Sequence, residues 1–337
     1  MNSNPVISVI MSTYNTPDEW LEESVNSILN QTYSNFEFII VDDCSTTGMT
    51  AIKEKCADDR IIWVRNEVNI GLTKSLNNAL KIAKGKYIAR MDADDISLPE
   101  RFVTQIEFME NHPEVIVCGS WRRAIGNENG DEIWNIPATR EEQQVQLFFY
   151  NCGLTHPTAM FRKSMLDEFE IRYNENYKKT QDYGIWVQCT RFAPMVMIRQ
   201  VLLQYRKSDS QVTANKNGVR LYDSMVKIDQ LYALGIEPTD NEKELHLAFL
   251  RGETLDVVKI SQWVRAISNA NKKIEYFDNK LFQSALNRRW YEYCKTQYKG
   301  QRNVAYHAEY KASRKLTYVL NDYVLIIKKI IKNMIGR

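Results

Sequence analysis

The first hundred residues alternate between short apolar runs and stretches in which apolar residues recur at helical spacing. The apolar runs are rich in β-branched and aromatic residues and predict buried strands at residues 6–11, 36–41, 61–65 and 86–91. The intervening stretches predict helices, such as one over 72–83 that Gly85 follows. Strands that alternate with helices predict an α/β fold, in which a mostly parallel sheet carries helices on its faces.

The rest of the chain is less regular and then becomes helical. A helix, a strand and a hairpin are expected over 99–111, 115–119 and 120–137, with Asn129-Gly130 as the hairpin turn. Beyond residue 215 apolar stripes predict several helices, among them 242–251, 256–270 and 278–298. The sequence therefore predicts two parts, a first domain over 1–215 and a helical region over 216–337.

Polar residues cluster where three of the predicted strands end. The segment Thr13–Asn15 follows the first strand, Asp42-Asp43 follows the second, and Asp92–Asp95 follows the fourth. In open α/β sheets, ligands bind beyond the carboxyl ends of the strands. We therefore expect these three clusters to meet at one crevice.

The acidic residues of these clusters have a structural and a functional interpretation. Asp42-Asp43 could simply cap a helix or fill a turn. That reading is weaker for Asp92, Asp94 and Asp95, because three carboxylates within four residues repel one another and call for a cation or several donors. Hard oxygen ligands with few histidines favour Mg²⁺ or Mn²⁺ over zinc, and Mg²⁺ commonly completes its shell with substrate phosphates. The expected ligand is a divalent cation together with a diphosphate.

The composition and the absence of certain motifs weigh against several functional classes. With 44 basic and 42 acidic residues, the chain does not predict a nucleic-acid partner. Neither G-x-G-x-x-G nor G-x-x-x-x-G-K-[ST] occurs, which weighs against dinucleotide enzymes and P-loop NTPases. The six cysteines show no C-x-x-C spacing, and residues 1–5 do not resemble a signal peptide, so reduced thiols in the cytoplasm are expected.

Taken in order, several segments resemble the family 2 glycosyltransferases with the GT-A fold. In the first domain they are V-I-S-V-I-M-S-T-Y-N at 6–15, Q-T-Y-S-N-F-E-F-I-I-V-D-D-C-S at 31–45, N-I-G-L-T-K-S-L-N at 69–77 and A-K-G-K-Y-I-A-R-M-D-A-D-D at 83–95. Later come P-E-R-F-V-T-Q at 99–105, H-P-T-A-M-F-R at 156–162 and Q-D-Y-G-I-W at 181–186. The resemblance covers about residues 5–213 and leaves 214–337 without a counterpart.

The resemblance implies a nucleotide-sugar site. The residues implied to line it are Thr13, Tyr14, Asn15, Asp42, Asp43, Lys74, Asp92, Asp94 and His156. One or both carboxylates of the Asp42-Asp43 pair would accept a hydrogen bond from the uracil imide, since an acceptor-only group selects for an N–H donor. For Lys74 a solvated helix position, and for His156 a purely structural role, remain open.

The resemblance also implies a metal site and a base. Asp94 would contact Mn²⁺ or Mg²⁺ directly, and Asp92 would lie nearer the ribose or the water shell of the ion. Asp95 would cap a helix or support its neighbours. Asp182 would act as the catalytic base that deprotonates the acceptor hydroxyl, as an inverting transfer requires. Its alternative is a helix cap.

Two positions depart from the family pattern. Gln181 precedes the predicted base, where the family often has glutamate. Ser208 follows Tyr205-Arg206-Lys207, where the family often has a histidine that binds the metal or the diphosphate. We therefore expect a weaker metal site, with Arg206 or Lys207 contributing positive charge.

Together these features predict an inverting hexosyltransferase. It would move a hexose or N-acetylhexosamine from a UDP-sugar to a hydroxyl of a glycan acceptor, with a β-linkage formed, in synthesis of a surface polysaccharide such as a capsule or O-antigen. The acceptor would be a lipid-linked oligosaccharide at the inner face of the cell membrane. Two alternatives stay open, a sugar-1-phosphate nucleotidyltransferase and a non-catalytic UDP-binding scaffold.

The last residues form a basic segment with an amphipathic pattern. Residues 311–337 hold seven of the 44 basic residues and one of the 42 acids, so the rest of the chain is slightly acidic. A basic amphipathic helix of this kind is typical of binding to an anionic membrane surface. The alternative is a helix packed on the body or on another subunit.

Deletion of residues 311–337 is expected to abolish binding to vesicles that contain anionic lipid. The local positive charge and the apolar face would both be lost. Co-sedimentation with phosphatidylglycerol vesicles measures the effect, with phosphatidylcholine vesicles as the control. Equal binding by the full and the shortened chain would contradict the membrane interpretation.

Overall fold

The computed structural model describes residues 4–47, 49–127, 129–151, 153–208 and 216–301. The chain divides into two compact units, Met1–Val226 and Lys227–Arg337. The division falls inside helix α8 (Lys216–Ala233), and the predicted boundary at residues 215/216 stays a prediction. The predicted basic helix at 311–337 lies outside the described residues.

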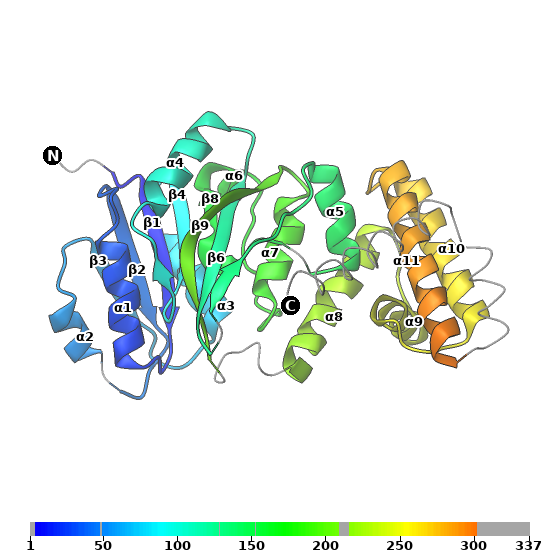
Figure 1. The fold of residues 1–337 in the computed structure, drawn as a ribbon, viewed down its shortest axis with the longest axis horizontal. Coiled ribbons are helices and arrows are strands. Elements are labelled where there is room, and N and C mark those ends of the chain that lie inside the picture. Colours follow the sequence, from blue (N-terminus) through cyan, green and yellow to red (C-terminus); the bar gives the residue numbers. More distant parts are fainter. Residues whose placement is uncertain (1–3, 48, 128, 152, 209–215, 302–337) are drawn as a thin grey trace, which may run out of the picture. The chain divides into compact units, whose positions relative to one another are not determined.

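The first unit is built on a nine-stranded mixed sheet (Figure 1). Four parallel strands, in the order β3-β2-β1-β4, form one side: β3 (Ile61–Arg65), β2 (Phe36–Asp42), β1 (Ile7–Thr13) and β4 (Tyr87–Asp92). The sheet continues from β4 through β8 (Met160–Arg162), β6 (Val117–Gly126), β9 (Met195–Lys207) and β5 (Ile96–Ser97). The four strands expected in the first hundred residues are confirmed.

Helices cover both faces of this sheet because its strands are apolar on both sides. On β1, Val9 and Met11 belong to one buried cluster with residues of α1, whereas Ile10 belongs to a second cluster with residues of α3. The helices of this unit that precede α8 are α1 (Asp18–Leu29), α2 (Thr50–Lys55), α3 (Leu72–Ile82), α4 (Arg101–Asn111), α5 (Arg140–Phe149), α6 (Lys163–Glu168) and α7 (Gln181–Cys189). A short 3₁₀ turn spans His156–Thr158.

The predicted hairpin exists, but its turn is not where the sequence places it. Strand β7 (Gly130–Glu132) pairs antiparallel with β6, and Ala124 lies opposite Gly130. Gly130 is therefore a strand residue and not a turn residue. Gly126, the last residue of β6, has a positive φ of 93°, which favours glycine.

The helices of the second unit lie close to the predicted ranges. They are α9 (Asp240–Arg251), α10 (Val257–Ile274) and α11 (Asn279–Gln301). Thr239 and Glu242 form a reciprocal capping box at the start of α9, and Asp256 caps α10. Within the described residues, no helix has the length and hydropathy needed to cross a membrane.

Five cysteines fall within the described residues, and all are free thiols: Cys44, Cys56, Cys118, Cys189 and Cys294. Four of them are buried, and Cys44 is partly exposed. Burial raises the pKa of the Cys118 thiol to about 12. These four thiols are therefore part of the packing, as the sequence predicts.

Gly85 allows β4 to begin close against β1. Its N–H donates to Ser8 Oγ at 2.8 Å, and the Ser8 hydroxyl in turn donates to Glu37 on β2. A Cβ at this position would lie 2.4 Å from the backbone nitrogen of Ser8 and 2.6 Å from the carbonyl carbon of Ile7. Both contacts involve backbone, so they cannot be relieved by a rotamer change.

The substitution Gly85→Ala is therefore expected to lower the free energy of unfolding by about 1–3 kcal/mol, the usual cost of overpacking. Urea unfolding followed by circular dichroism measures it. The neighbouring exposed Lys84→Ala serves as the control and is expected to change stability by less than about 0.5 kcal/mol. Equal stability of the two variants would contradict this account of the β1–β4 contact.

Candidate functional site

The carboxyl ends of three adjacent parallel strands bring the predicted clusters together. In the β1–β2 register Thr13 lies opposite Asp42, and in the β1–β4 register Ser12 lies opposite Asp92. Residues paired in this way lie on adjacent hydrogen-bonded strands, whose axes are roughly 5 Å apart. The three polar segments therefore occupy one edge of the sheet.

The loops after β1 and β2 are tied to each other. The side-chain oxygen of Asn15 accepts hydrogen bonds from the backbone N–H of Thr46 at 2.8 Å and from its hydroxyl at 3.0 Å. The Asn15 N–H donates to Ser45 Oγ at 3.0 Å, and Asn15 itself has a positive φ of 51°. Tyr14, between these anchored residues, is 50% exposed. The result is a fixed loop that presents an aromatic ring to solvent.

Asp42 is buried and paired with a cation that the sequence analysis did not single out. One carboxylate oxygen accepts from the Ser45 N–H at 2.9 Å, and the other forms an ion pair with Arg65. Arg65 is the last residue of β3 and lies opposite Asp42 in the register. It also donates to the Ser45 carbonyl at 3.0 Å. A charged residue at the end of an apolar strand is the signal that could have found it.

Asp43 anchors the loop that leads into α3. Its carboxylate accepts hydrogen bonds from the backbone N–H groups of Ile70 at 2.9 Å and Gly71 at 2.8 Å, and from the Asn66 side chain at 2.8 Å. Asp43 is buried, so these three donors compensate the loss of water. The two neighbouring aspartates thus differ, because Asp43 fixes a loop and Asp42 holds an exposed guanidinium.

The structure places Lys74 and His156 in different settings. Lys74 is half exposed on α3, with its ammonium 3.9 Å from the Glu175 carboxylate. His156 is buried, and its Nε2 lies 2.7 Å from the Tyr173 hydroxyl. Burial and the nearby charge of Arg90 hold the pKa of His156 well below its usual value. His156 is therefore a neutral, hydrogen-bonded side chain.

The end of β4 carries the predicted acidic cluster. One carboxylate oxygen from each of Asp92, Asp94 and Asp95 lies within 4.8 Å of the other two. Burial and the charge of Asp92 raise the pKa of Asp94 to about 6, and burial with both neighbouring charges raises the pKa of Asp95 well above its usual value. Asp95 is fully buried, and its Oδ2 has no hydrogen-bond partner among the described residues. An all-oxygen set with an unsatisfied buried carboxylate fits a hard divalent cation.

Strand β9 closes the other side of the acidic cluster through Arg206. Its backbone N–H donates to Asp95 Oδ1 at 2.9 Å, and its Nε donates to the Asp94 carbonyl at 2.8 Å. The guanidinium also lies over the Trp20 ring, with its central carbon 5.1 Å from the ring centroid, and pairs with Glu23. These contacts fix the backbone of the acidic segment. Ser208, where the resemblance led us to expect a histidine, follows directly after β9.

Asp182 lies in the first turn of α7, where its Oδ1 accepts from the backbone N–H of Tyr183 at 2.8 Å. Burial raises the pKa of Asp182, the charge of Arg90 lowers it, and that of Asp92 raises it. The predicted base and the acidic cluster therefore interact electrostatically, although 90 residues separate them in sequence. Gln181, beside it, is buried.

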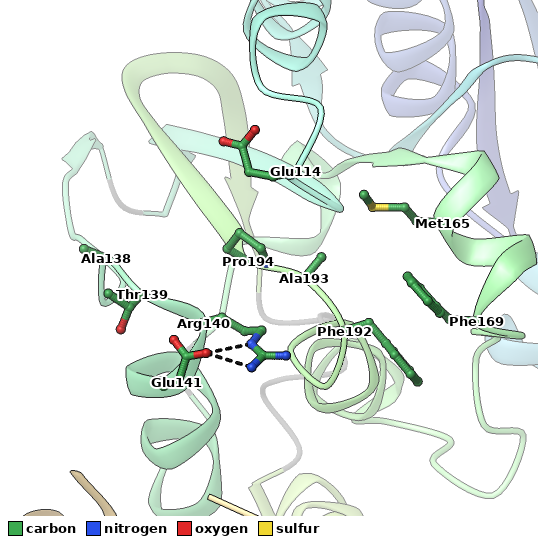
Figure 2. Close-up of a pocket in the computed structure, with 10 residues that line it drawn as sticks. All are labelled: Glu114, Ala138, Thr139, Arg140, Glu141, Met165, Phe169, Phe192, Ala193 and Pro194. Carbon is green, nitrogen blue, oxygen red and sulfur yellow. Dashed lines mark hydrogen bonds and ion pairs between the residues drawn. The ribbon is translucent and has the colours of Figure 1, made fainter. Parts of the chain in front are cut away.

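A cavity of about 430 Å³ elsewhere in the first unit contains none of the predicted site residues. It is lined by residues that precede β6 and β9, such as Glu114 and Pro194, and so lies toward the amino ends of these strands. Figure 2 shows Phe169 and Phe192 at its wall, with their rings stacked 4.3 Å apart. The acidic cluster lies instead beside the carboxyl end of β9, where Arg206 donates hydrogen bonds to Asp94 and Asp95.

Comparison with known proteins assigns the family. Residues 8–169 match the model of glycosyl transferase family 2. An uncharacterized glycosyltransferase of Methanocaldococcus jannaschii is 39% identical over 208 residues, which cover 60% of this chain and 71% of that protein. The putative glycosyltransferase EpsE of Bacillus subtilis is 46% identical over 192 residues, which cover 56% of this chain and 68% of that protein. The O-antigen biosynthesis glycosyltransferase WbnJ of Escherichia coli is 34% identical over 209 residues, which cover 60% of this chain and 79% of that protein.

A solved structure shows the same fold. The Staphylococcus aureus protein TarS, residues 1–349, crystallised in complex with UDP-GlcNAc, aligns with a TM-score of 0.56 at 18% identity, over 91% of this chain and 88% of that one. The architecture is thus GT-A, as the resemblance implies. The chain belongs to glycosyl transferase family 2 and is a glycosyltransferase. The nucleotidyltransferase alternative has no support from these comparisons.

Proposed function

We propose that the chain is an inverting glycosyltransferase that uses a UDP-sugar and a divalent cation. The observation that supports the proposal is the meeting of three strand ends at one edge of the sheet, where the carboxylates of Asp92, Asp94 and Asp95 lie together. The charge of Arg90 lowers the pKa of Asp182 and that of Asp92 raises it, which supports a place for Asp182 beside the same site. One group of carboxylates is suited to a cation, and the separate one is suited to a proton transfer.

The nucleotide would bind at the ends of β1 and β2. The exposed ring of Tyr14 offers a surface on which uracil can stack. One or both of the buried Asp42 and Asp43 carboxylates would accept the imide N–H in addition to the donors that they already hold. The exposed part of Arg65 adds a donor beside Asp42. Thr13, Asn15, Lys74 and His156 complete the proposed set, with His156 acting through the packing of its loop. The UDP and UDP-GlcNAc complexes of TarS support a UDP-sugar donor.

The cation, Mn²⁺ or Mg²⁺, would be held by Asp94, with Asp92 as its second ligand or as a ligand of its water shell. When bound, it supplies electrostatic stabilisation of the negative charge that develops on the leaving diphosphate. Arg206 holds the Asp94 carbonyl and the Asp95 carboxylate, and so fixes the shape of the ligand loop. The oxygen-only donor set supports the choice of metals.

Asp182 would accept the proton of the acceptor hydroxyl. The oxygen of that hydroxyl then attacks the anomeric carbon from the face opposite the leaving UDP, which inverts the configuration and gives a β-linkage from an α-linked donor. The carboxylate is oriented by the Tyr183 N–H at the start of α7. One positioned base is sufficient for this transfer.

The acceptor is proposed to be a growing glycan of a surface polysaccharide, carried on a lipid. The names of the relatives support this class: WbnJ of Escherichia coli acts in O-antigen biosynthesis, and AmsE of Erwinia amylovora in amylovoran biosynthesis. AmsE is 28% identical over 235 residues. A lipid-linked acceptor places the enzyme at the inner membrane surface, with residues 311–337 as its proposed contact.

Asp182→Asn is expected to lower acceptor-dependent UDP release by about 10²–10⁴-fold, the usual loss on removing a positioned base. A panel of UDP-hexoses and UDP-N-acetylhexosamines with Mn²⁺ serves as donor, and UDP formation is measured with and without a glycan acceptor. Asp167→Asn on α6, whose carboxylate pairs with Lys163 and Arg172, is the matched control and should retain activity. Equal rates for wild type and Asp182→Asn would contradict the base assignment, and no UDP release from any donor would favour the scaffold alternative.

The acidic limb of the pH profile is expected to report Asp182. The base must be ionised, and burial raises its pKa above the usual 3.8, so kcat/KM should fall as the pH drops through a value higher than that. Above this pH the rate should reach a plateau. The residual activity of Asp182→Asn should lack this limb. An unchanged limb in the variant would assign it to another group.

A further inference from the structure

Arg90 is a cation buried beneath the acidic cluster. It lies on β4 two residues before Asp92, so both side chains project from the same face of the strand. Arg90 is 2% exposed, and its Nη2 forms an ion pair with Asp92 Oδ1. Its Nε and Nη1 have no hydrogen-bond partner among the described residues. A guanidinium buried in this way is retained only where nearby negative charge stabilises it.

The negative charge around Arg90 comes from the whole site. Its charge opposes the rise in pKa that burial causes at Asp94, Asp95 and Asp182. Its backbone is fixed as well, since its carbonyl accepts from the Arg101 guanidinium at 2.8 Å and its N–H donates to the Ala159 carbonyl at 2.9 Å. The main chain of Arg90 is therefore held in place at the end of β4.

We propose that Arg90 is a positioning residue that limits the affinity of the acidic cluster for a divalent cation. It does so by occupying one oxygen of Asp92 and by placing a permanent positive charge beside the ion. The inference rests on the proposed function, since the cation is taken to work with a diphosphate. Arg90 leaves open the other oxygen of Asp92, the carboxylate of Asp94 and the unsatisfied Oδ2 of Asp95.

The consequence is cooperation between the cation and the diphosphate. A divalent ion that approaches the cluster is repelled by the fixed charge of Arg90 and finds Asp92 partly engaged. A diphosphate adds negative charge and further oxygen ligands, which offset that repulsion. The cation should therefore bind weakly alone and firmly together with UDP, so that free metal is not trapped in the empty enzyme.

The test measures Mn²⁺ binding by the full chain without nucleotide, using electron paramagnetic resonance of free Mn²⁺. Arg90→Met removes the charge and frees Asp92, and it is expected to bind Mn²⁺ about tenfold more tightly or better than wild type. Arg90→Lys keeps the charge and should stay within about threefold of wild type. A general loss of packing would weaken binding, so a gain in affinity separates the proposal from a purely structural role.

Arg162→Met is the matched control for the loss of a buried arginine. Arg162 lies on β8 and donates only to backbone carbonyls and the Tyr87 hydroxyl, so its removal should leave Mn²⁺ affinity unchanged. Where Arg90→Met does not fold, Arg90→Gln removes the charge and keeps a donor for Asp92. Unchanged or weaker Mn²⁺ binding by the folded neutral variant would overturn the proposal. Failure of wild type to bind Mn²⁺ with UDP would instead refute the proposed function.

Discussion

Carboxylate crowding at the end of β4 is the constraint on which the rest of the site depends. Three aspartates lie within a few ångströms of one another, and the charge of one of them, Asp92, raises the pKa of a fourth, Asp182. Like charges at this spacing destabilise each other, and burial adds to the cost. The fold compensates with Arg90 below the cluster and Arg206 beside it. Both arginines are held by their strands, so the positive charge is permanent.

This arrangement holds the acidic loop in place without the histidine that the resemblance led us to expect at position 208. Ser208 cannot act as an imidazole ligand, yet Arg206 two residues earlier fixes the backbone of Asp94 and the carboxylate of Asp95. The ligand loop is therefore held by β9 itself. The shape of the loop therefore does not depend on residue 208, which agrees with the proposed cation that depends on its diphosphate partner.

Much of the fold was predictable because its signals are local. The strand and helix periods of residues 6–91 gave the parallel half of the sheet, and the polar residues after three strands pointed to one edge. In the mixed half, a strand over 115–119 and a hairpin were predicted, but the pairing of β9 with β6 was not. These two strands are about 80 residues apart, and the sequence of β9 does not alternate cleanly. The Asn129-Gly130 turn was misplaced because Gly130, in β7, pairs with Ala124 of β6, which the two turn residues alone do not reveal.

The site residues that the sequence missed are those whose partners are set by tertiary structure. Arg65 looks like an ordinary strand residue until the β2–β3 register places it beside Asp42. Arg90 lies two residues before Asp92 on the same strand, but its burial, which makes their ion pair matter, is set by the packing of the sheet. Tyr173, which holds His156, lies in a loop with no motif of its own. Conversely, the different tasks of Asp42 and Asp43 follow from loop hydrogen bonds that sequence alone does not reveal.

The most direct measurement is the position of Mn²⁺ in crystals grown with UDP, located by anomalous diffraction at the manganese edge. The account predicts a single strong peak against the Asp94 carboxylate and the diphosphate, with the uracil beside Tyr14 and Asp42 and with Asp182 facing the same cleft. A peak distant from Asp94, or a uridine diphosphate bound away from the ends of β1 and β4, would contradict it.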